Sequence, residues 1–390
     1  MIRLLTIIGA RPQIIKAAAI SREIADNFSD KIEERILHTG QHYDENMSGL
    51  FFKELGIPEP DINLNVGSAS HGVMTARIIE GVEEVLTEEH YDGVILYGDT
   101  NSTLAASVAA SKLHIPIFHI EAGLRSYDME IPEEVNRCVC DQLSSILFAP
   151  TQTAVDNLMK EGYCNSPMLM YGGRKRLVIN SGDVMYDNSM YFSQIADKKS
   201  KLMKILGLEP KNFILSTIHR NNNTDEPKRL NAIFRALLDI SERYDIKVVL
   251  PLHPRTRKLM PKNLSQELMD RLNNSKNIKV IEPASFFDII ELEKNAKVVV
   301  TDSGGVQKES FFFETPTVIM LHDTPWVEIV ENNAGICVDA DYDRIMEAYR
   351  VLSTKEVKFP KLFGDGHASN KILNEIFNYF TNDKHFDTKQ

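Results

Sequence analysis

Residues 93–120, GVILYGDTNSTLAASVAASKLHIPIFHI, decide the fold of this chain. Two short apolar runs, GVILY and IPIF, enclose a segment with the pattern of a helix. Apolar runs without alternating polar residues are typical of strands that are buried on both faces of a parallel sheet. The order strand, helix, strand therefore predicts an α/β architecture with helices on both faces of the sheet.

The same alternation recurs along all 390 residues and restarts near residue 185. A chain of this length suits two domains. We predict two doubly wound, Rossmann-like domains, residues 1–184 and 185–365, joined near GDVMYDN, with a C-terminal helix (366–384) that packs back on the first. The predicted strands lie within residues 3–9, 33–39, 93–99, 115–121, 146–151 and 177–182, and then 213–220, 247–254, 278–283, 296–305, 316–321 and 335–340.

The composition excludes several classes of protein. The net charge is −11, whereas nucleic-acid binding depends on clustered Lys and Arg, so we expect no nucleic-acid partner. No apolar run approaches the ~18 residues that would span a bilayer, so we expect no membrane association. The four cysteines, with Cys138 and Cys140 spaced C-x-C, fit neither a zinc pair nor a disulfide framework. We therefore predict reduced thiols, a cytoplasmic protein and no metal site.

Ligands bind at the carboxyl ends of strands in open parallel sheets, so polar residues just after a strand are candidate site residues. GARPQIIK follows the first strand, and its helix start, with Arg11 and Lys16, suits an anionic ligand. A plain turn with a solvated arginine is the alternative. HTGQHYD follows the second strand, where Gln41 and His42 either reach a ligand or shape a turn.

Three carboxylates follow strands of the first predicted domain. Asp99 comes directly after a strand, where it either serves catalysis or belongs to the cap of the next helix. Glu121 ends the following strand, at the level of Asp99 if the two strands are neighbours. Glu133 lies in the first turn of a helix, four residues before Arg137, with which it can pair. Carboxylates that converge can act as acid and base, because they shift one another's pKa.

Basic residues follow the first two strands of the second predicted domain. His219 and Arg220, in STIHRN, should face the first domain across a cleft and suit a phosphate or leaving group. A hydrogen-bonded histidine at a helix start is the alternative. PLHPRTR repeats the pattern less specifically with His253.

Residues 298–310, VVVTDSGGVQKES, carry the clearest phosphate signal. Ser303, Gly304 and Gly305 turn from a strand into a helix whose N–H groups can cradle a diphosphate. Glu309, two turns into the helix, can accept hydrogen bonds from both hydroxyls of a ribose. The alternative is a Gly-rich turn before a surface helix.

Together these motifs resemble the non-hydrolysing UDP-N-acetylglucosamine 2-epimerase family. GARPQIIK, GDTNSTLAA, HIEAGLR, PEEVNR, the HR of STIHRN and TDSGGVQKES span most of the chain in order. The resemblance implies the GT-B-like two-domain fold of retaining nucleotide-sugar glycosyltransferases, an interdomain cleft that binds the nucleotide sugar, and a homodimer. It also implies elimination of UDP to a 2-acetamidoglucal and re-addition with inverted C2, with no metal or nicotinamide cofactor.

The resemblance also assigns roles to single residues. It implies that Asp99, Glu121 and Glu133 are the acid/base carboxylates and that His219 lies at the leaving phosphate. The UDP contacts that it implies are Arg11, Lys16, Ser303, Gly304, Gly305 and Glu309.

Several positions depart from the usual pattern of the family. Ala10 and Gln13 stand where Thr and Glu are usual, and Trp326 stands in TPWVE where an arginine is expected. GSASHGVM lacks the glutamine with which many bacterial members bind a second, activating substrate molecule. GARPQ and WVE are more similar to the subgroup acting on UDP-2,3-diacetamido-2,3-dideoxyglucuronate. The basic insertion GGRKR is interpreted as a solvated loop between strands.

The leading prediction is therefore C2 epimerisation of UDP-GlcNAc to UDP-ManNAc for polysaccharide biosynthesis, with the diacetamido uronate as a close second. A retaining UDP-sugar glycosyltransferase would explain SGG and Glu309 but not the three carboxylates. A hydrolysing epimerase shares the acids and differs in releasing free sugar. A non-catalytic nucleotide-sugar sensor needs the SGG turn but not the acids.

Overall fold

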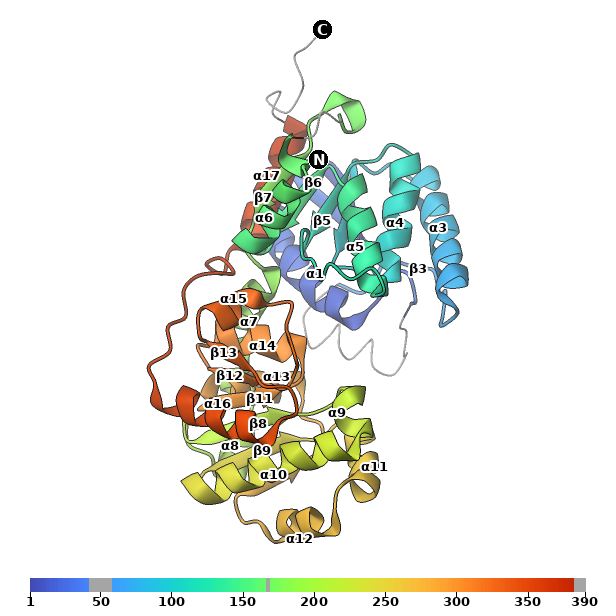
Figure 1. Ribbon diagram of the computed structural model, residues 1–390. Coiled ribbons are helices and arrows are strands. Elements are labelled where there is room, and N and C mark those ends of the chain that lie inside the picture. The colour runs from blue at the N-terminus through green and yellow to red at the C-terminus, as the bar shows by residue number, and fades with distance from the viewer. Residues whose placement is uncertain (42–57, 166–168, 382–390) are drawn as a thin grey trace. The chain divides into compact units, whose positions relative to one another are not determined.

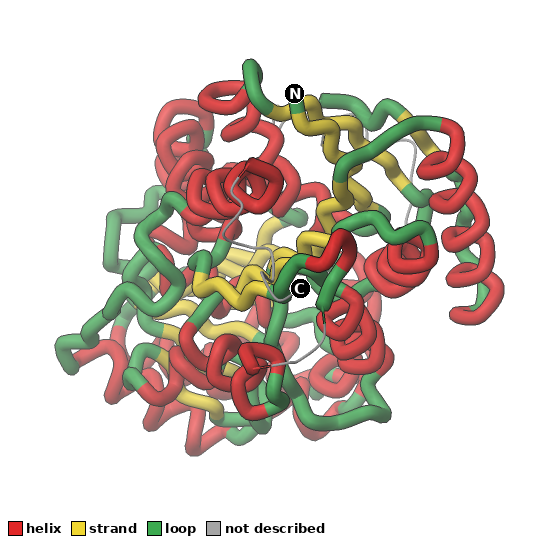
Figure 2. The backbone as a smooth tube through the Cα atoms, turned by 90° about the horizontal axis from the view of Figure 1, so that it is seen from above, coloured by secondary structure: helices red, strands yellow, loops and turns green. Residues whose placement is uncertain are grey.

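The computed structural model describes residues 1–41, 58–165 and 169–381 (Figure 1). The chain divides into two compact units, with the first boundary at the end of GDVMYDN. Unit 1 comprises Met1–Asn188 and Lys361–Gln390, and unit 2 comprises Ser189–Pro360. In both units the strands, yellow in Figure 2, are accompanied by helices in red.

Unit 1 contains a seven-stranded sheet in the order β3-β2-β1-β4-β5-β6-β7, and its strands pair in parallel. The chain starts at the centre, runs to one edge, returns and continues to the other edge, which places helices on both faces. The strand predictions in this half are confirmed, but β3 was missed because two residues form no apolar run. The strands are β1 Ile2–Ile8, β2 Ile32–His38, β3 Ile62–Asn63, β4 Gly93–Tyr97, β5 Ile117–Ile120, β6 Ile146–Ala149 and β7 Leu177–Asn180.

The helices of unit 1 cover its sheet on both faces. Helices α3, α4 and α5 lie side by side (Figure 1), and α3 and α4 bury Met74, Ile78 and Ala106 against β1 and β4. The helices are α1 Arg11–Glu23, a π-helix at Ile24–Phe28, α3 His71–Glu88, α4 Asn101–Lys112, α5 Pro132–Leu143, α6 Gln152–Lys160, 3₁₀ turns at Tyr163–Asn165 and Tyr171–Gly173, and α17 Ala368–Thr381. Helix α7, Val184–Lys199, begins in unit 1 and ends in unit 2.

The C-terminal helix α17 packs within unit 1, where it contacts α1. The ring of Tyr379 meets Phe118 of β5 edge to face, with centroids 5.5 Å apart. Asp187 of α7 accepts hydrogen bonds from the backbone N–H groups of Ala368 (3.0 Å) and Ser369 (2.7 Å). These N–H groups open the helix and have no intrahelical acceptor, so Asp187 satisfies them.

Two arginines of the basic insertion Gly172–Arg176 are packed against the protein, whereas Gly172, Gly173 and Lys175 are exposed, so its interpretation as a solvated loop holds only in part. The Arg174 guanidinium lies 4.6 Å from the ring centroid of Tyr379 in α17. Arg176 is buried and its Nε donates to the Ser144 carbonyl at 3.1 Å. The arginine stems and planar head groups pack on apolar and aromatic surface, which a pattern of charges does not reveal.

Unit 2 contains a six-stranded parallel sheet in the order β10-β9-β8-β11-β12-β13. All six predicted strands are confirmed: β8 Phe213–Thr217, β9 Lys247–Pro251, β10 Ile278–Ile281, β11 Val298–Thr301, β12 Thr317–Ile319 and β13 Gly335–Cys337. The helices are α8 Leu202–Leu206, α9 Asn221–Asp225, α10 Pro227–Tyr244, α11 Pro254–Asn263, α12 Gln266–Asn274, α13 Phe286–Asn295, α14 Gly304–Phe312, α15 Val327–Glu331 and α16 Tyr342–Thr354.

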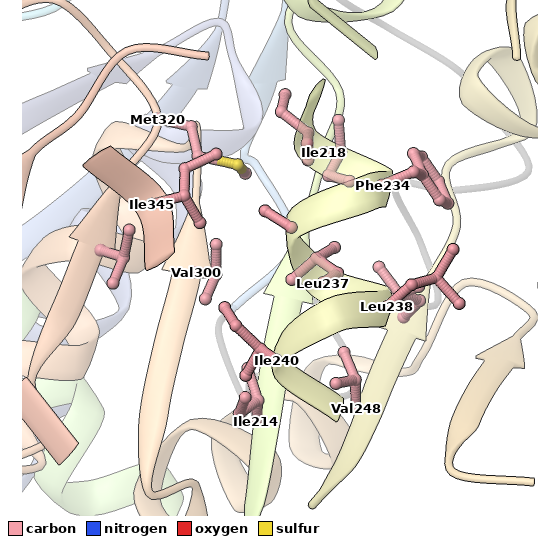
Figure 3. Packing of buried hydrophobic residues seen from close by; sticks show 14 of the residues in the cluster. Ile214, Ile218, Phe234, Leu237, Leu238, Ile240, Val248, Val300, Met320 and Ile345 are labelled. Atoms are coloured by element: carbon pink, nitrogen blue, oxygen red, sulfur yellow. The ribbon is translucent and has the colours of Figure 1, made fainter. Parts of the chain in front are cut away.

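Successive residues of the strands in unit 2 face opposite sides of the sheet. Ile214 of β8 packs with Phe234 and Leu237 of α10 in the larger cluster (Figure 3). Its neighbours Phe213 and Leu215 pack with Leu292 of α13 on the other side. The sheet is therefore buried on both faces, as its uninterrupted apolar runs predict.

Candidate active site

Three side chains from two motifs hold the turn that carries Asp99. The Gly98 carbonyl accepts a hydrogen bond from His119 Nε2 at 2.7 Å. The Asp99 carbonyl accepts one from Asn136 Nδ2 at 2.9 Å, and the Asp99 carboxylate forms an ion pair with Arg137. HIEAGLR and PEEVNR therefore position both the backbone and the carboxylate of Asp99.

Thr100, and not Asp99, caps α4. Thr100 Oγ1 accepts a hydrogen bond from the Thr103 N–H at 3.3 Å. The aspartate is therefore not required as the N-cap of this helix, and its carboxylate is directed to Arg137 instead.

Glu121 directly follows β5, the strand next to β4, which precedes Asp99. Strands β4 and β5 are neighbours, and Gly98 N donates to the Ile120 carbonyl at 3.0 Å, so the two acids follow adjacent strand ends as predicted. Glu121 forms an ion pair with Lys16 of α1. A Cβ added at Gly98 would lie 3.2 Å from Lys16 Nζ and 3.4 Å from Glu121 Oε2. Gly98 thus leaves space for this pair.

The backbone at these two strand ends is unusual. Gly98 has φ +61°, which glycine adopts readily, and Glu121 has φ +73°, which costs free energy for a residue with a side chain. Non-glycine residues at positive φ are often found at functional sites, where surrounding contacts hold them. The Glu121 and Ala122 N–H groups both donate to the Phe148 carbonyl at 3.1 Å, which holds the Glu121 turn.

His119 is fully buried and donates hydrogen bonds from both ring nitrogens. Nδ1 faces Asp141 Oδ1 at 2.7 Å and Nε2 faces the Gly98 carbonyl, so both nitrogens need a proton. Burial alone would lower the pKa of His119, but the neighbouring Cys140 and Asp141 outweigh it and raise the pKa to about 10. Arg125 also pairs with Asp141 at 2.7 Å, so this carboxylate is shared by two cations.

Glu134, and not Glu133, pairs with Arg137, so the predicted i,i+4 ion pair is wrong. Glu134 is 1% exposed, pairs with Arg137 at i,i+3, and accepts from the N–H groups of Ser126 and Tyr127 at 3.1 Å. Glu133 is exposed in the same first turn of α5. Consecutive residues on a helix point about 100° apart, which separates the two acids.

The start of α1 is fixed by Gln13, one of the departures from the family pattern. Its Oε1 accepts from the N–H groups of Gly9 (2.9 Å) and Ala10 (3.1 Å), and its Nε2 donates to the Tyr97 carbonyl (2.9 Å). The amide therefore ties the β1–α1 turn to the end of β4. Arg11 lies beside it and is exposed.

Gly9 is required by a close approach of α4. A Cβ at Gly9 would lie 2.1 Å from Ser102 Oγ and 2.2 Å from Thr39 Oγ1. Gln41 is buried nearby and accepts hydrogen bonds from Ser102 N (3.0 Å) and Oγ (2.7 Å). This contact corresponds to the turn-shaping alternative for Gln41, whereas His42 lies outside the described residues.

His219 in unit 2 is held by Asp302. Its Nδ1 lies 2.9 Å from Asp302 Oδ1, and its backbone N–H donates to the same carboxylate at 3.1 Å. Asp302 is fully buried, and although burial would raise its pKa, hydrogen bonds from His219 and its charge lower it below the usual range. The remaining ring nitrogen, Nε2, belongs to a side chain that is 45% exposed, so it is accessible to a ligand.

The Ser303–Gly305 turn follows β11 and opens α14. Ser303 Oγ caps the helix by accepting from Val306 N at 3.4 Å. A Cβ at Gly304 would meet only Trp326 Nε1, at 3.7 Å, and a Cβ at Gly305 only Ser303 Oγ, at 3.9 Å. Neither glycine is required by a close contact or by positive φ, unlike Gly9 and Gly98.

Glu309 has a carboxyl neighbour that the sequence did not suggest. Glu293 of α13 is fully buried. Burial, and then the negative charge of Glu309, raise the pKa of Glu293 well above its usual value. Burial and the charge of Glu309 therefore both favour the protonated form of Glu293.

The remaining basic candidates of unit 2 are paired within the protein. A ring nitrogen of His253 accepts from Arg255 N at 3.3 Å, which caps α11. Arg220 Nε donates to the Asp302 carbonyl at 3.0 Å. Both residues thus have structural contacts, and their role in binding stays a prediction. Among the described residues, no cluster of three or more side chains suited to a metal ion occurs.

Sequence reasoning missed three residues that hold candidate site residues or their turns. Asn136, Asp141 and Asp302 lie inside or close to motifs, but each pairs with a residue distant in the chain. Asn136 and Asp302 had a usable signal, because they belong to the quoted motifs PEEVNR and TDSGGVQKES. Asp141 of α5 lies beyond the quoted motifs and pairs with His119 of β5, so spacing alone gave no indication.

Comparison with known proteins identifies the family of this chain. The family described as UDP-N-acetylglucosamine 2-epimerase matches residues 26–377. The chain belongs to this family. It is 45% identical over 371 residues to the UDP-2,3-diacetamido-2,3-dideoxy-D-glucuronate 2-epimerase of Pseudomonas aeruginosa, covering 95% of this chain and 98% of that one. It is 38% identical over 373 residues to a UDP-N-acetylglucosamine 2-epimerase of Methanococcus maripaludis, covering 95% and 97%.

A solved structure of the family confirms the predicted fold class. The Methanocaldococcus jannaschii UDP-GlcNAc 2-epimerase in complex with UDP-GlcNAc and UDP has a TM-score of 0.79 and is 36% identical. The match covers 96% of this chain and 99% of that chain. The epimerase fold therefore extends over nearly the whole sequence. None of the described helices has the length and apolar character to cross a membrane.

We predict that His119→Gln removes a pH dependence of stability. The folded pKa of about 10 exceeds the ordinary value of 6.5, so the stabilisation is complete below pH 6.5 and is lost as pH rises toward 10. Between pH 6.5 and 10 the melting temperature should fall less steeply with pH in the variant than in the wild type. In free energy of unfolding, the two slopes should differ by up to about 1.4 kcal/mol per pH unit. His90→Gln, at an exposed histidine, should keep the wild-type slope; equal slopes in both variants would contradict the prediction.

Proposed function

We propose that this protein is a non-hydrolysing C2 epimerase that interconverts UDP-GlcNAc and UDP-ManNAc. The observation that carries the proposal is the pair of acids at adjacent strand ends, Asp99 with Arg137 and Glu121 with Lys16. Membership of the epimerase family supports the same reaction. A binding protein would need the Ser303–Gly305 turn but would have no use for an acid held at positive φ, as Glu121 is.

The proposed reaction is an elimination followed by a re-addition. A carboxylate of unit 1 removes the C2 proton, the electrons of that bond form the C1–C2 double bond, and the C1–O bond breaks with its electron pair on UDP. Protonation of the 2-acetamidoglucal on the opposite face of C2, with re-formation of the C1–O bond, gives the other epimer. Asp99, Glu121 and Glu133 are the proposed acid and base groups.

Unit 2 is proposed to bind the UDP leaving group. The N–H groups of the Ser303–Gly305 turn would hold the diphosphate, and His219, oriented by Asp302, would stabilise the charge that develops on the leaving oxygen. Arg11, Lys16, Gln41, His42, Arg137, Arg220, His253 and Glu309 remain candidate contacts of the UDP-sugar. No close contact inside the protein requires glycine at positions 304 and 305, which supports the proposal that a ligand approaches the backbone closely there.

A second candidate substrate is UDP-2,3-diacetamido-2,3-dideoxyglucuronate. The 45% identity to the Pseudomonas aeruginosa enzyme named for that sugar favours it. So do Gln13 and Trp326, which replace residues usual in the family. Both substrates require the same chemistry at C1 and C2 and differ at C3 and C6.

We further propose a cytoplasmic homodimer that supplies precursors of a polysaccharide. Four free cysteines and the resemblance to a dimeric family support this proposal. Cell fractionation, sedimentation analysis and glycan analysis of a deletion strain test its three parts. A secreted protein, a monomer or an unchanged polysaccharide would contradict the corresponding part.

Incubation in D₂O with each candidate sugar tests the proposed reaction. Proton removal and return at C2 should place solvent deuterium at C2 of both epimers, detected by NMR, with the preferred sugar reacting faster. Epimer formation without deuterium would rule out the elimination. Accumulation of free UDP would indicate a hydrolysing enzyme, and turnover only with an added sugar acceptor would indicate a glycosyltransferase.

The adjacent acids of α5 allow a matched test of the carboxylate roles. Glu133→Gln should lower kcat at least about 100-fold, because an acid/base group is lost, with an unchanged melting temperature. Glu134→Gln should instead lower the melting temperature, because buried Glu134 pairs with Arg137 and accepts two backbone hydrogen bonds. An active Glu133→Gln enzyme would remove Glu133 from the mechanism.

Two glycine substitutions separate packing from ligand binding. Gly305→Ala should keep or slightly raise the melting temperature, because its Cβ has space and alanine favours a helix, yet it should weaken UDP binding about 10-fold or more by calorimetry. Gly9→Ala should cost about 1–3 kcal/mol of stability, because its Cβ overlaps two buried hydroxyl groups. Unchanged UDP affinity in Gly305→Ala would argue against a diphosphate at this turn.

A further inference from the structure

The sole tryptophan of the chain, Trp326, lies beside the Ser303–Gly305 turn. It immediately precedes α15 and is 6% exposed. Its indole Nε1 lies 3.7 Å from the position that a Cβ on Gly304 would occupy, which is the nearest atom to that position. The polar edge of the indole is therefore directed to the turn at which the diphosphate is proposed to bind.

A lysine cation lies on the face of the same indole. Lys308 follows Gly304 by about one turn in α14, and its Nζ is 4.1 Å from the ring centroid of Trp326. Lys308 is buried, with 4% of its surface exposed. A cation at this distance is attracted by the negative face of the ring and, in a desolvated setting, more strongly so. The pair thus brings an N–H donor and a positive charge to the start of α14.

The loop that carries Trp326 is itself held by α14. Thr324 Oγ1 donates to Gln307 Oε1 at 2.6 Å and accepts from Trp326 N at 3.2 Å. Gln307 is fully buried. Because these contacts come from the helix that begins at Gly304, the indole and the glycine turn are positioned as one group, without an ordering step on binding.

We infer that Trp326 and Lys308 form part of the diphosphate-binding site. The indole Nε1–H donates a hydrogen bond to a phosphate oxygen held by the backbone N–H groups of the turn. Lys308 holds the ring in position and adds positive charge next to the phosphates. Trp326 is thereby a binding residue of the nucleotide-sugar site, and this inference rests on the proposed function.

Intrinsic fluorescence tests the inference on the unmodified protein, because the only tryptophan is the proposed contact. Addition of UDP should change the tryptophan emission saturably, with the dissociation constant measured by calorimetry, whereas uridine should leave it unchanged. A tryptophan distant from the site serves as control. In the variant Trp326→Phe with Tyr244→Trp, at the far end of α10, UDP should not alter the emission.

Two substitutions test the hydrogen bond itself. Trp326→Phe keeps a ring for Lys308 but removes the N–H, and should weaken UDP binding about 10-fold, as loss of a charge-assisted bond implies. Biosynthetic replacement of the single tryptophan by benzothienylalanine, which has sulfur in place of the N–H, should have the same effect with almost no change in shape, should Trp326→Phe fail to fold. Lys308→Met should weaken UDP binding and reduce its dependence on salt.

The outcomes separate this inference from the proposed function. Protein that binds UDP by calorimetry with no change in emission overturns the inference and leaves the proposed function intact. UDP affinity within twofold of wild type in the N–H-free protein also overturns it. No binding of UDP or UDP-GlcNAc to the wild-type protein would overturn the proposed function and the inference together.

Discussion

The candidate active site of unit 1 depends on one buried imidazolium, that of His119. Its two N–H groups join three parts of the unit: the strand that carries it, α5 through Asp141, and the β4 turn through the Gly98 carbonyl. A neutral imidazole could satisfy only one of these acceptors. The protonated His119 therefore holds the Gly98 carbonyl, and with it the turn that carries Asp99, beside the end of β5, which Glu121 follows.

The acids are then held by separate cations. Arg137 of α5 forms an ion pair with the Asp99 carboxylate, and Lys16 of α1 forms one with the Glu121 carboxylate. The positive φ at Glu121 is costly by about 1–3 kcal/mol, and the hydrogen bonds of its turn to Phe148 offset it. Stability is thus given up locally to direct a carboxylate, which agrees with a role for Glu121 in proton transfer.

The candidate site of unit 2 differs from that of unit 1 in the groups that it uses. Its candidate site uses backbone N–H groups, two glycines with open space, and a histidine oriented by a buried aspartate. Such a site suits an anion whose charge is spread over several oxygens, because several weak donors share the contact. Trp326, which stands where an arginine is usual in the family, lies beside this turn with Lys308 on the face of its ring.

The sequence by itself determined the strands, except for the two-residue β3, and the order of the motifs, because buried parallel strands require continuous apolar runs and short turns follow them directly. It also indicated Asp99 and Glu121, since the carboxyl ends of neighbouring strands meet at one edge. Only the tertiary structure decided that Arg137 pairs with Glu134, that Arg174 packs on α17, and that Lys308 lies on Trp326. These contacts join residues by the angle of a side chain on its helix or across elements distant in the chain, and neither spacing nor composition encodes that geometry.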